Sequence, residues 1–248
     1  MTKLINKKIN TIRKLPANID FKDIELFQSE LQRMIPPSRA ILRKNLLVVN
    51  YSIFGLRFPN LVIKDAFFEK PGLKKILKDT IKNILTSKKE IETINKACWI
   101  VDNKSTVYFH FICDALSRAI MVEEKLKQYP VLLTPALKKN TYVKEILDNL
   151  DIPYIQMEKK FYFVRELLLT SHASPSGNYN PLLIKRISNK FQNENKFQNK
   201  NERIWIDRKN ERRDIINFHE IEKILEKFNF KTTNFQDMSL KDKKEILS

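Results

Sequence analysis

Three side chains that can carry acid–base or anion chemistry recur at steps of four residues in one short segment. They are His110, Asp114 and Arg118, and a helix would place them on one side, together with Ser117, because it turns by about 100° per residue. An imidazole or a carboxylate can accept a proton from a hydroxyl group, and a guanidinium can bind an anion. The plainer interpretation is an i,i+4 pair of His110 and Asp114 that stabilises a solvated helix face by only about 0.2–0.5 kcal/mol.

The neighbouring sequence predicts the elements that position this segment. The apolar run Ala97–Val101 predicts a strand over 97–102, and the helical pattern continues over 107–127 after a polar turn. Ligands of α/β folds bind at such a strand-to-helix end. We expect the apolar side of the helix to pack on the sheet, and that side carries Phe109, Ile112, Cys113, Leu116 and Ile120.

Short apolar runs then alternate with helical patterns. We expect strands at 131–133, 154–155 and 161–169 and helices at 141–150 and 180–190. This alternation predicts an α/β fold with a mostly parallel, Rossmann-like sheet and helices on both faces. His172 lies in a polar loop after the strand at 161–169, where it either approaches a substrate or is simply exposed to solvent.

The N-terminal part has a less regular pattern. It predicts a basic, poorly ordered arm at 1–19, a helix at 20–34, strands at 46–49 and 61–63, and an amphipathic helix at 71–85. The lysines of this last helix cover either a membrane, a polyanion or, as is commoner for basic surface helices, only solvent.

A polar repeat, Lys-Phe-Gln-Asn written twice, separates this region from the C-terminus. It predicts a linker, because it offers little apolar surface for a core. After it we expect a strand at 203–208, a helix at 218–228, a strand at 230–235 and a helix capped by Ser239. The predicted domains are an N-terminal arm and mixed α/β segment, a Rossmann-like acceptor-side domain, a linker and an incomplete donor domain, at 1–96, 97–191, 192–202 and 203–248.

The composition restricts the classes of protein to consider. With 46 basic and 29 acidic residues the net charge is +17, which suits nucleic acid, an anionic membrane or phosphorylated ligands. The lysines are spread along the chain and form no compact basic cluster, so a nucleic-acid-binding protein is the alternative and not the preferred interpretation. No stretch predicts a signal peptide or a membrane span, and we expect a cytoplasmic protein.

Missing motifs argue against several enzyme classes. Three glycines do not allow a G-x-G-x-x-G turn or a Walker A loop, which argues against nicotinamide Rossmann enzymes and P-loop NTPases. No H-E-x-x-H pattern or paired C-x-x-C predicts a metal site. Cys98 and Cys113 lie in apolar patterns and are expected to be reduced core residues. A bound nucleotide diphosphate would therefore be held by side chains and helix N-termini.

Three blocks in order resemble glycosyltransferase family sixty-one, which includes capsular polysaccharide enzymes, plant xylosyltransferases and the EGF-domain O-GlcNAc transferase. Val107–Arg118 resembles its "YFHW-x-x-[DE]-x-LPR" segment, and Val164–Pro181 resembles its strand, polar loop and Asn-Pro helix start. Residues 203–220 resemble its "I-x-I-S-R…R-x-I-x-N-E-x-E" segment, with matching positions at Arg208, Arg213, Ile215, Asn217 and Glu220. Asp207 stands where serine is usual, and His219 where the family tends to have an acidic residue.

The resemblance implies a GT-B-like, metal-independent enzyme without a cofactor. In it Arg208, Arg213 and Asn217 bind the donor phosphates, with a surface salt bridge as the plainer role for the arginines. The segment around His110 and Asp114 faces the cleft, and either residue serves as the catalytic base. Arg118 either orients Asp114 or holds an anionic acceptor.

The activity implied by the resemblance is transfer of a sugar from a nucleotide sugar to a polysaccharide or lipid-linked glycan, in capsular polysaccharide biosynthesis. It places the protein in the cytoplasm, with peripheral contact at the inner face of the cell membrane. The family's G-A-G-L loop and the rest of the donor site would follow residue 248, so a truncated, inactive relic is a second interpretation. The sugar, the acceptor and the stereochemical outcome are left open.

Overall fold

The computed structural model describes residues 2–55, 63, 91–159, 161–175, 178–192, 202–207, 215–235 and 238–247. The chain forms two compact units, Met1–Asn189 and Lys190–Ser248. The helix predicted at 71–85 and most of the predicted linker and of the strand at 61–63 lie outside the described residues. Among the described helices, none is both long and apolar enough to cross a membrane.

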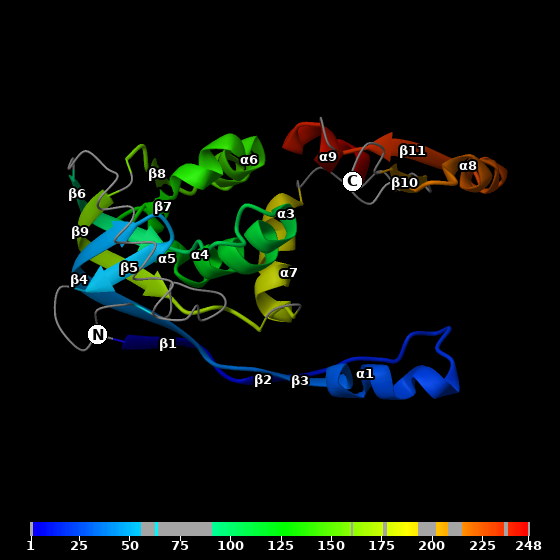
Figure 1. Ribbon diagram of the computed structural model, residues 1–248, viewed down its shortest axis with the longest axis horizontal. Helices are drawn as coiled ribbons and strands as arrows, with labels where there is room; N and C mark the ends of the chain where they lie inside the picture. The colour runs from blue at the N-terminus through cyan, green and yellow to red at the C-terminus, as the bar shows by residue number, and fades with distance from the viewer. Residues whose placement is uncertain are drawn as a thin grey trace. The chain divides into compact units, whose positions relative to one another are not determined.

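One seven-stranded sheet dominates the first unit (Figure 1). Strands β9, β6, β7 and β8 are parallel neighbours in that order, and β4 pairs antiparallel with β9, β1 and β5. Their bounds are β1 Thr2–Asn6, β4 Ser38–Val49, β5 Ser52–Gly55, β6 Glu92–Trp99, β7 Val131–Leu133, β8 Tyr154–Gln156 and β9 Phe161–Thr170. The α/β prediction is confirmed, and the sheet is rich in parallel pairs.

The antiparallel pairing of β4 with β5 has a local cause. Only Asn50 and Tyr51 separate β4 from β5, and so short a connection can join antiparallel strands but not parallel ones. Asn50 has a φ of 51°, a left-handed conformation that asparagine tolerates better than most residues. The alternation after residue 97 predicted a mostly parallel sheet, and the strands after residue 91 are parallel neighbours, while those before residue 56 pair antiparallel.

The core lies around β6 and β9. Five consecutive residues, Ala97 to Val101, are each 0% exposed. A strand covered on both faces needs apolar side chains at every position, which explains why this run does not alternate. Cys98 lies within it, while Cys113 is only half-buried, and neither cysteine forms a disulfide. Burial raises the pKa of the Cys98 thiol to about 12, so it is an inert core residue as predicted.

The other predicted elements after residue 97 are confirmed to within a few residues, apart from the start of β6, which begins earlier. They include α6 Thr141–Asn149 and α7 Pro181–Phe191, whereas the short helix η4 Pro135–Lys139 was not predicted. Asn180 starts α7 as expected, since its Oδ1 accepts the backbone N–H of Leu182 at 3.1 Å.

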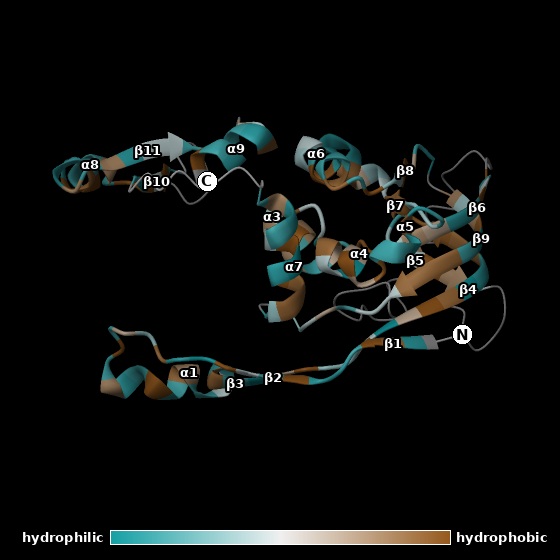
Figure 2. Cartoon of the chain, turned by 180° about the vertical axis from the view of Figure 1, so that it is seen from behind, coloured by the Kyte–Doolittle hydropathy of each residue, from teal (hydrophilic) through white to brown (hydrophobic). Residues whose placement is uncertain are grey.

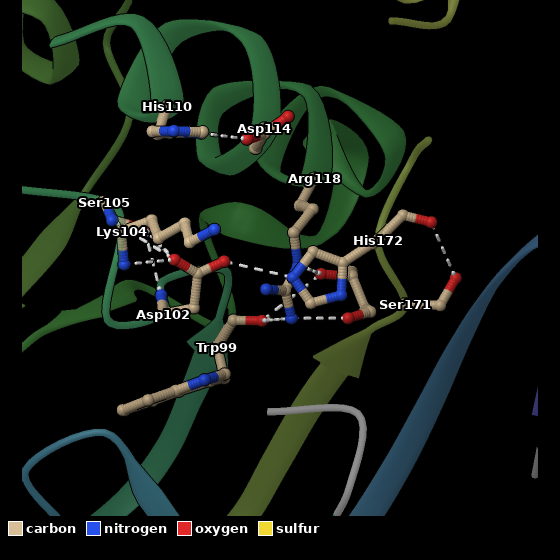
Figure 3. A network of polar contacts seen from close by, with 10 residues as sticks. Trp99, Asp102, Lys104, Ser105, His110, Asp114, Arg118, Ser171 and His172 are labelled. Atoms are coloured by element: carbon tan, nitrogen blue, oxygen red, sulfur yellow. Dashed lines mark hydrogen bonds and ion pairs between the residues drawn. The ribbon is translucent and has the colours of Figure 1, made fainter. Parts of the chain in front are cut away.

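The helix predicted at 107–127 is present but irregular. It consists of α3 Tyr108–His110, a π-helical turn η3 Phe111–Leu116, α4 Ser117–Met121 and α5 Glu123–Leu126. The prediction of its faces was wrong in part, because Asp114, Ser117 and Arg118 are buried and Phe109 is 50% exposed. The π-helical turn changes the regular spacing of side chains. The polar side consequently faces inward, toward the ends of the strands (Figure 3).

The N-terminal residues are more ordered than predicted. Residues 1–19 do not form an irregular arm, because β1 joins the sheet and β2 Ile9–Ile12 pairs with β3 Gln32–Ile35. The helix expected at 20–34 is shortened to η1 Phe21–Asp23 and α1 Ile24–Leu31. Strand pairing over Gln32–Ile35 overrides the local helical pattern there.

The second unit begins as a β-α-β arrangement. Strands β10 Arg203–Asp207 and β11 Phe230–Asn234 are parallel, and α8 Phe218–Lys227 lies between them in the sequence. Helix α9 Leu240–Leu247 follows. Ser239 starts α9 as predicted, since its Oγ accepts the N–H of Asp242 at 3.2 Å and the Asp242 carboxylate accepts the N–H of Ser239 at 3.3 Å.

Candidate functional site

Two histidine–carboxylate pairs lie close together at the carboxyl ends of β6 and β9 (Figure 3). The first joins His110 and Asp114, with 2.7 Å between the imidazole Nδ1 and the carboxylate Oδ2. A carboxylate can only accept, so Nδ1 carries the hydrogen and donates it. The predicted neighbours are therefore in contact, and the Asp114 side chain is 7% exposed against 21% for His110. This burial argues against the plainer interpretation of a solvated surface pair.

The second pair joins Asp102 and His172, which are far apart in the sequence. The His172 Nε2 lies 3.0 Å from the Asp102 Oδ2, and the Asp102 side chain is 3% exposed. The other carboxylate oxygen of Asp102 accepts backbone N–H groups of Lys104 and Ser105 at 2.8 and 3.1 Å. Asp102 thus fixes the turn that leads from β6 into the helix of His110.

This second pair lies where the order of the strands reverses. The chain passes from β6 to β7 and β8 on one side and returns as β9 on the other side of β6. Asp102 follows the end of β6, and His172 follows the end of β9. Open α/β sheets bind their ligands in the crevice at such a reversal, outside the carboxyl ends of the strands.

Arg118 ties the helix to both strand ends. It is 0% exposed, and its Nη2 donates to the carbonyl oxygen of Thr170 at 2.5 Å and to that of Trp99 at 3.5 Å. Its Nε also donates to the Thr170 hydroxyl at 3.1 Å. Trp99 and Thr170 are the last residues of β6 and β9, so one guanidinium holds these neighbouring strands and α4 together.

Burial and charge shift the acid–base behaviour of these groups in different directions. Burial raises the pKa of Asp114, although the hydrogen bond from His110 opposes the shift. Burial would also raise the pKa of Asp102, but the hydrogen bond from His172, the charge of Arg118 and the Lys104 N–H together hold it below its ordinary value. Burial and the charge of Arg118 lower the pKa of His172 against the attraction of Asp102. At neutral pH an ionised Asp102 therefore faces a neutral His172.

Not every predicted site residue lies in this cluster. Arg208 and Arg213 lie outside the described residues. Asn217 belongs to the second unit, where it directly precedes α8 and its amide donates to the Glu220 carboxylate at 3.1 Å. Within the described part of the chain, no group of three or more His, Cys, Asp or Glu side chains is arranged to hold a metal ion.

Sequence reasoning missed Asp102 and Thr170 and left the role of His172 open. The available signal was position, because all three stand at or just after the ends of two predicted strands. Parallel neighbours bring their carboxyl ends to one edge of a sheet. The sequence did not tell which strands are neighbours, and so it did not bring Asp102 to His172.

Replacing Asp102 by asparagine is expected to lower the pKa of His172 further, because the carboxylate charge is removed. In the wild type the pKa of His172 is already below about 6.5, its value in an unfolded chain. As the pH drops, His172 of the unfolded chain therefore takes up a proton before His172 of the folded protein does. The free energy of unfolding consequently falls as the pH drops through about 6.5. NMR titration of the His172 imidazole, in the wild type and in Asp102→Asn, measures this pKa. A pKa of His172 above about 6.5 in the wild type contradicts the neutral state that we assign to this residue.

Replacing Arg118 by methionine is expected to lower the free energy of unfolding of the first unit by about 2–4 kcal/mol, because buried carbonyl groups lose their donor. Urea unfolding followed by Trp99 fluorescence in a Trp205→Phe background reports on this unit. The matched control is Arg186→Met. Arg186 forms an exposed ion pair with Glu123, and its replacement should cost at most about 1 kcal/mol. Equal losses in the two variants contradict the structural role of Arg118.

The sequence from the start of α3 to the C-terminus has a known counterpart. Residues 108–248, more than half of the chain, match the profile of the family described as Glycosyltransferase 61. The matched region includes His110, Asp114, Arg118 and His172, while Asp102 lies six residues before its start. No curated protein and no solved structure matches the chain. The resemblance noted in the sequence is thus confirmed, and the chain belongs to the glycosyltransferase 61 family.

Proposed function

We propose that this chain transfers a sugar from a nucleotide-sugar donor to a hydroxyl group of a polysaccharide or lipid-linked glycan. Family membership supports sugar transfer in general. The observation that carries the finer proposal is the His110–Asp114 pair, a 2.7 Å contact at the carboxyl ends of β6 and β9. Such a pair can supply the base that accepts the proton of the acceptor hydroxyl group.

In this proposal His110 is the base and Asp114 orients it. The Nδ1 side of the ring faces the Asp114 carboxylate, so Nε2 takes the proton, as in other imidazole–carboxylate pairs. The acceptor O–H bond breaks and its oxygen bonds to the anomeric carbon of the donor. The bond from that carbon to the diphosphate breaks, and the nucleoside diphosphate leaves with the electron pair. The lower exposure of Asp114 favours His110 as the group that meets the acceptor.

Asp102, His172 and Arg118 form the support of this base. Asp102 fixes the turn before α3 through the N–H groups of Lys104 and Ser105, and His172 fixes Asp102. Arg118 holds the later part of the same helix to the strand ends. We assign Arg118 to positioning and not to an anionic acceptor, because the residue is 0% exposed.

The second unit binds the donor in this proposal, as one of two Rossmann-like domains of a GT-B-like enzyme. Arg208 and Arg213 follow β10, and Asn217 directly precedes α8, so all three belong to one strand-to-helix connection. Helix N–H groups and arginine forks bind phosphate oxygens at such connections. The two arginines neutralise the leaving diphosphate without a metal ion.

We further propose that the acceptor belongs to a surface or capsular polysaccharide assembled at the cytoplasmic face of the cell membrane. The net charge of +17 supports this location, since basic proteins are drawn to anionic lipid surfaces.

A panel of UDP-, GDP-, CMP- and TDP-sugars tests the donor assignment by thermal unfolding. One nucleotide class should stabilise the protein, by about 2.7 kcal/mol at a hundredfold excess over the dissociation constant. Arg208→Ala should abolish this stabilisation, because a phosphate ligand is lost. Lys223→Ala, which removes an exposed charge on α8, should keep it.

The other outcomes of the panel contradict the proposed function or one part of it. No stabilisation by any nucleotide sugar, from a folded protein, contradicts donor binding by this chain. Equal stabilisation of wild type and Arg208→Ala contradicts the phosphate assignment alone. A short DNA duplex belongs in the same panel, and stabilisation by the duplex but by no nucleotide sugar contradicts the proposed function.

A further inference from the structure

The N-terminal arm, residues 7–35, has almost no apolar core of its own. It consists of the β2–β3 ribbon with η1 and α1 between the two strands. Neither η1 nor α1 contains a buried residue, and Ile35 is the buried apolar residue of the arm, at 1% exposure. An isolated two-stranded ribbon is at best marginally stable in water. A surface outside the arm is therefore needed to cover it.

Large apolar side chains are exposed all along the arm. In the ribbon, Asn10 pairs with Met34 and Ile12 pairs with Gln32, and residues paired or two apart share a face. Ile12 and Met34 thus lie on one face, at 83% and 55% exposure. Phe21 and Leu26 continue the series on η1 and α1, at 87% and 73%. Figure 2 shows hydrophobic residues on β2 and on α1.

The charges around β2 favour an anionic surface. Residues 1–19 contain five basic and no acidic residues. Glu30 is neutralised by Arg13 at 3.4 Å and by Arg33, and Asp20 by Lys22 at 3.2 Å. The other two acidic residues of the arm, Asp23 and Glu25, lie on η1 and α1, so residues 7–35 contain six basic and four acidic residues. The ribbon itself is basic: Lys7, Lys8 and Lys14 form no ion pair with any described residue and lie on either side of β2.

We propose that the N-terminal arm binds an anionic lipid surface. Apolar side chains such as Phe21 and Leu26 enter the boundary between headgroups and acyl chains, and the lysines contact the lipid phosphates. Neither signal suffices alone, since stable peripheral binding needs both apolar contact and charge attraction. This inference rests on the proposed function in one respect, because it names the element that brings the enzyme to a membrane-bound acceptor.

A second copy of the chain fits the arm less well. Each copy carries the same lysines around β2, Lys7, Lys8 and Lys14, so two ribbons packed against each other would bring like charges into contact. Anionic lipid headgroups oppose these lysines with the complementary charge. The lipid surface is therefore the occupant that both the apolar and the charged residues of the arm favour.

Cosedimentation with lipid vesicles tests this proposal without a donor or an acceptor. The protein should bind phosphatidylglycerol-containing vesicles, bind phosphatidylcholine vesicles weakly or not at all, and be released by high salt. The variant Ile12→Ser/Phe21→Ser/Leu26→Ser should lose at least about tenfold in vesicle affinity. The control Ile91→Ser/Leu182→Ser, with residues 58% and 63% exposed outside the arm, should bind like the wild type.

Circular dichroism establishes that each variant is folded, and sedimentation velocity reports the oligomeric state. Absence of binding to anionic vesicles, or equal binding by the wild type and the arm variant, overturns the proposal. A wild-type dimer that the arm substitutions convert to a monomer, without vesicle binding, overturns it in favour of a second copy. None of these outcomes bears on donor stabilisation, so the vesicle test and the donor panel fail independently.

Discussion

The structure of the site depends on one buried guanidinium. Arg118 donates to the carbonyl oxygens that end β6 and β9, and the Thr170 hydroxyl also donates to that of Trp99 at 3.2 Å. Buried carbonyl groups at strand ends need such donors. A buried charge is costly unless several groups solvate it. Here two carbonyls, the Thr170 hydroxyl and the nearby negative charge of Asp102 do so. These contacts fix the position of α4. They therefore also fix Asp114 and His110, which lie about one and two helical turns before Arg118.

The two histidine–carboxylate pairs have different physical origins. His110 and Asp114 are four residues apart on one helix, so their contact needs only local structure. Asp102 and His172 are joined only because β6 and β9 are neighbours in the sheet. The first pair carries the proton chemistry that we propose. The second fixes the turn from which the helix starts, and the charge of Arg118 influences both of its members.

Local patterns in the sequence were sufficient for most elements after residue 97. The strand Val131–Leu133 and the helix Thr141–Asn149 follow directly from apolar runs and helical periodicity, because burial on one face repeats at a fixed step. The pairing of β4 with β9 was not predictable, since it joins segments more than a hundred residues apart. For the same reason the sequence identified His110 and Asp114 as partners but did not bring Asp102 to His172.

The helix faces show a further limit of periodicity. A regular helix would turn Phe109 toward the sheet, but the π-helical turn at Phe111–Leu116 alters the spacing. Polar groups at the strand ends then make the inward side of the helix the polar one. Arg118 is buried because its partners lie at these strand ends, and Asp114 is buried with His110 of the same helix as its partner. A pattern of apolar residues does not reveal such partners.

The most direct test of the account is chemical rescue of the proposed base. With the donor identified, His110→Ala should lower the transfer rate by about 10²–10⁴-fold, and added imidazole should restore part of it because the missing group is a proton acceptor. His172→Ala, which removes a positioning residue, should not respond to imidazole. Normal transfer by both His110→Ala and Asp114→Asn, or the same response to imidazole in the two histidine variants, would contradict the assignment of His110 as the base.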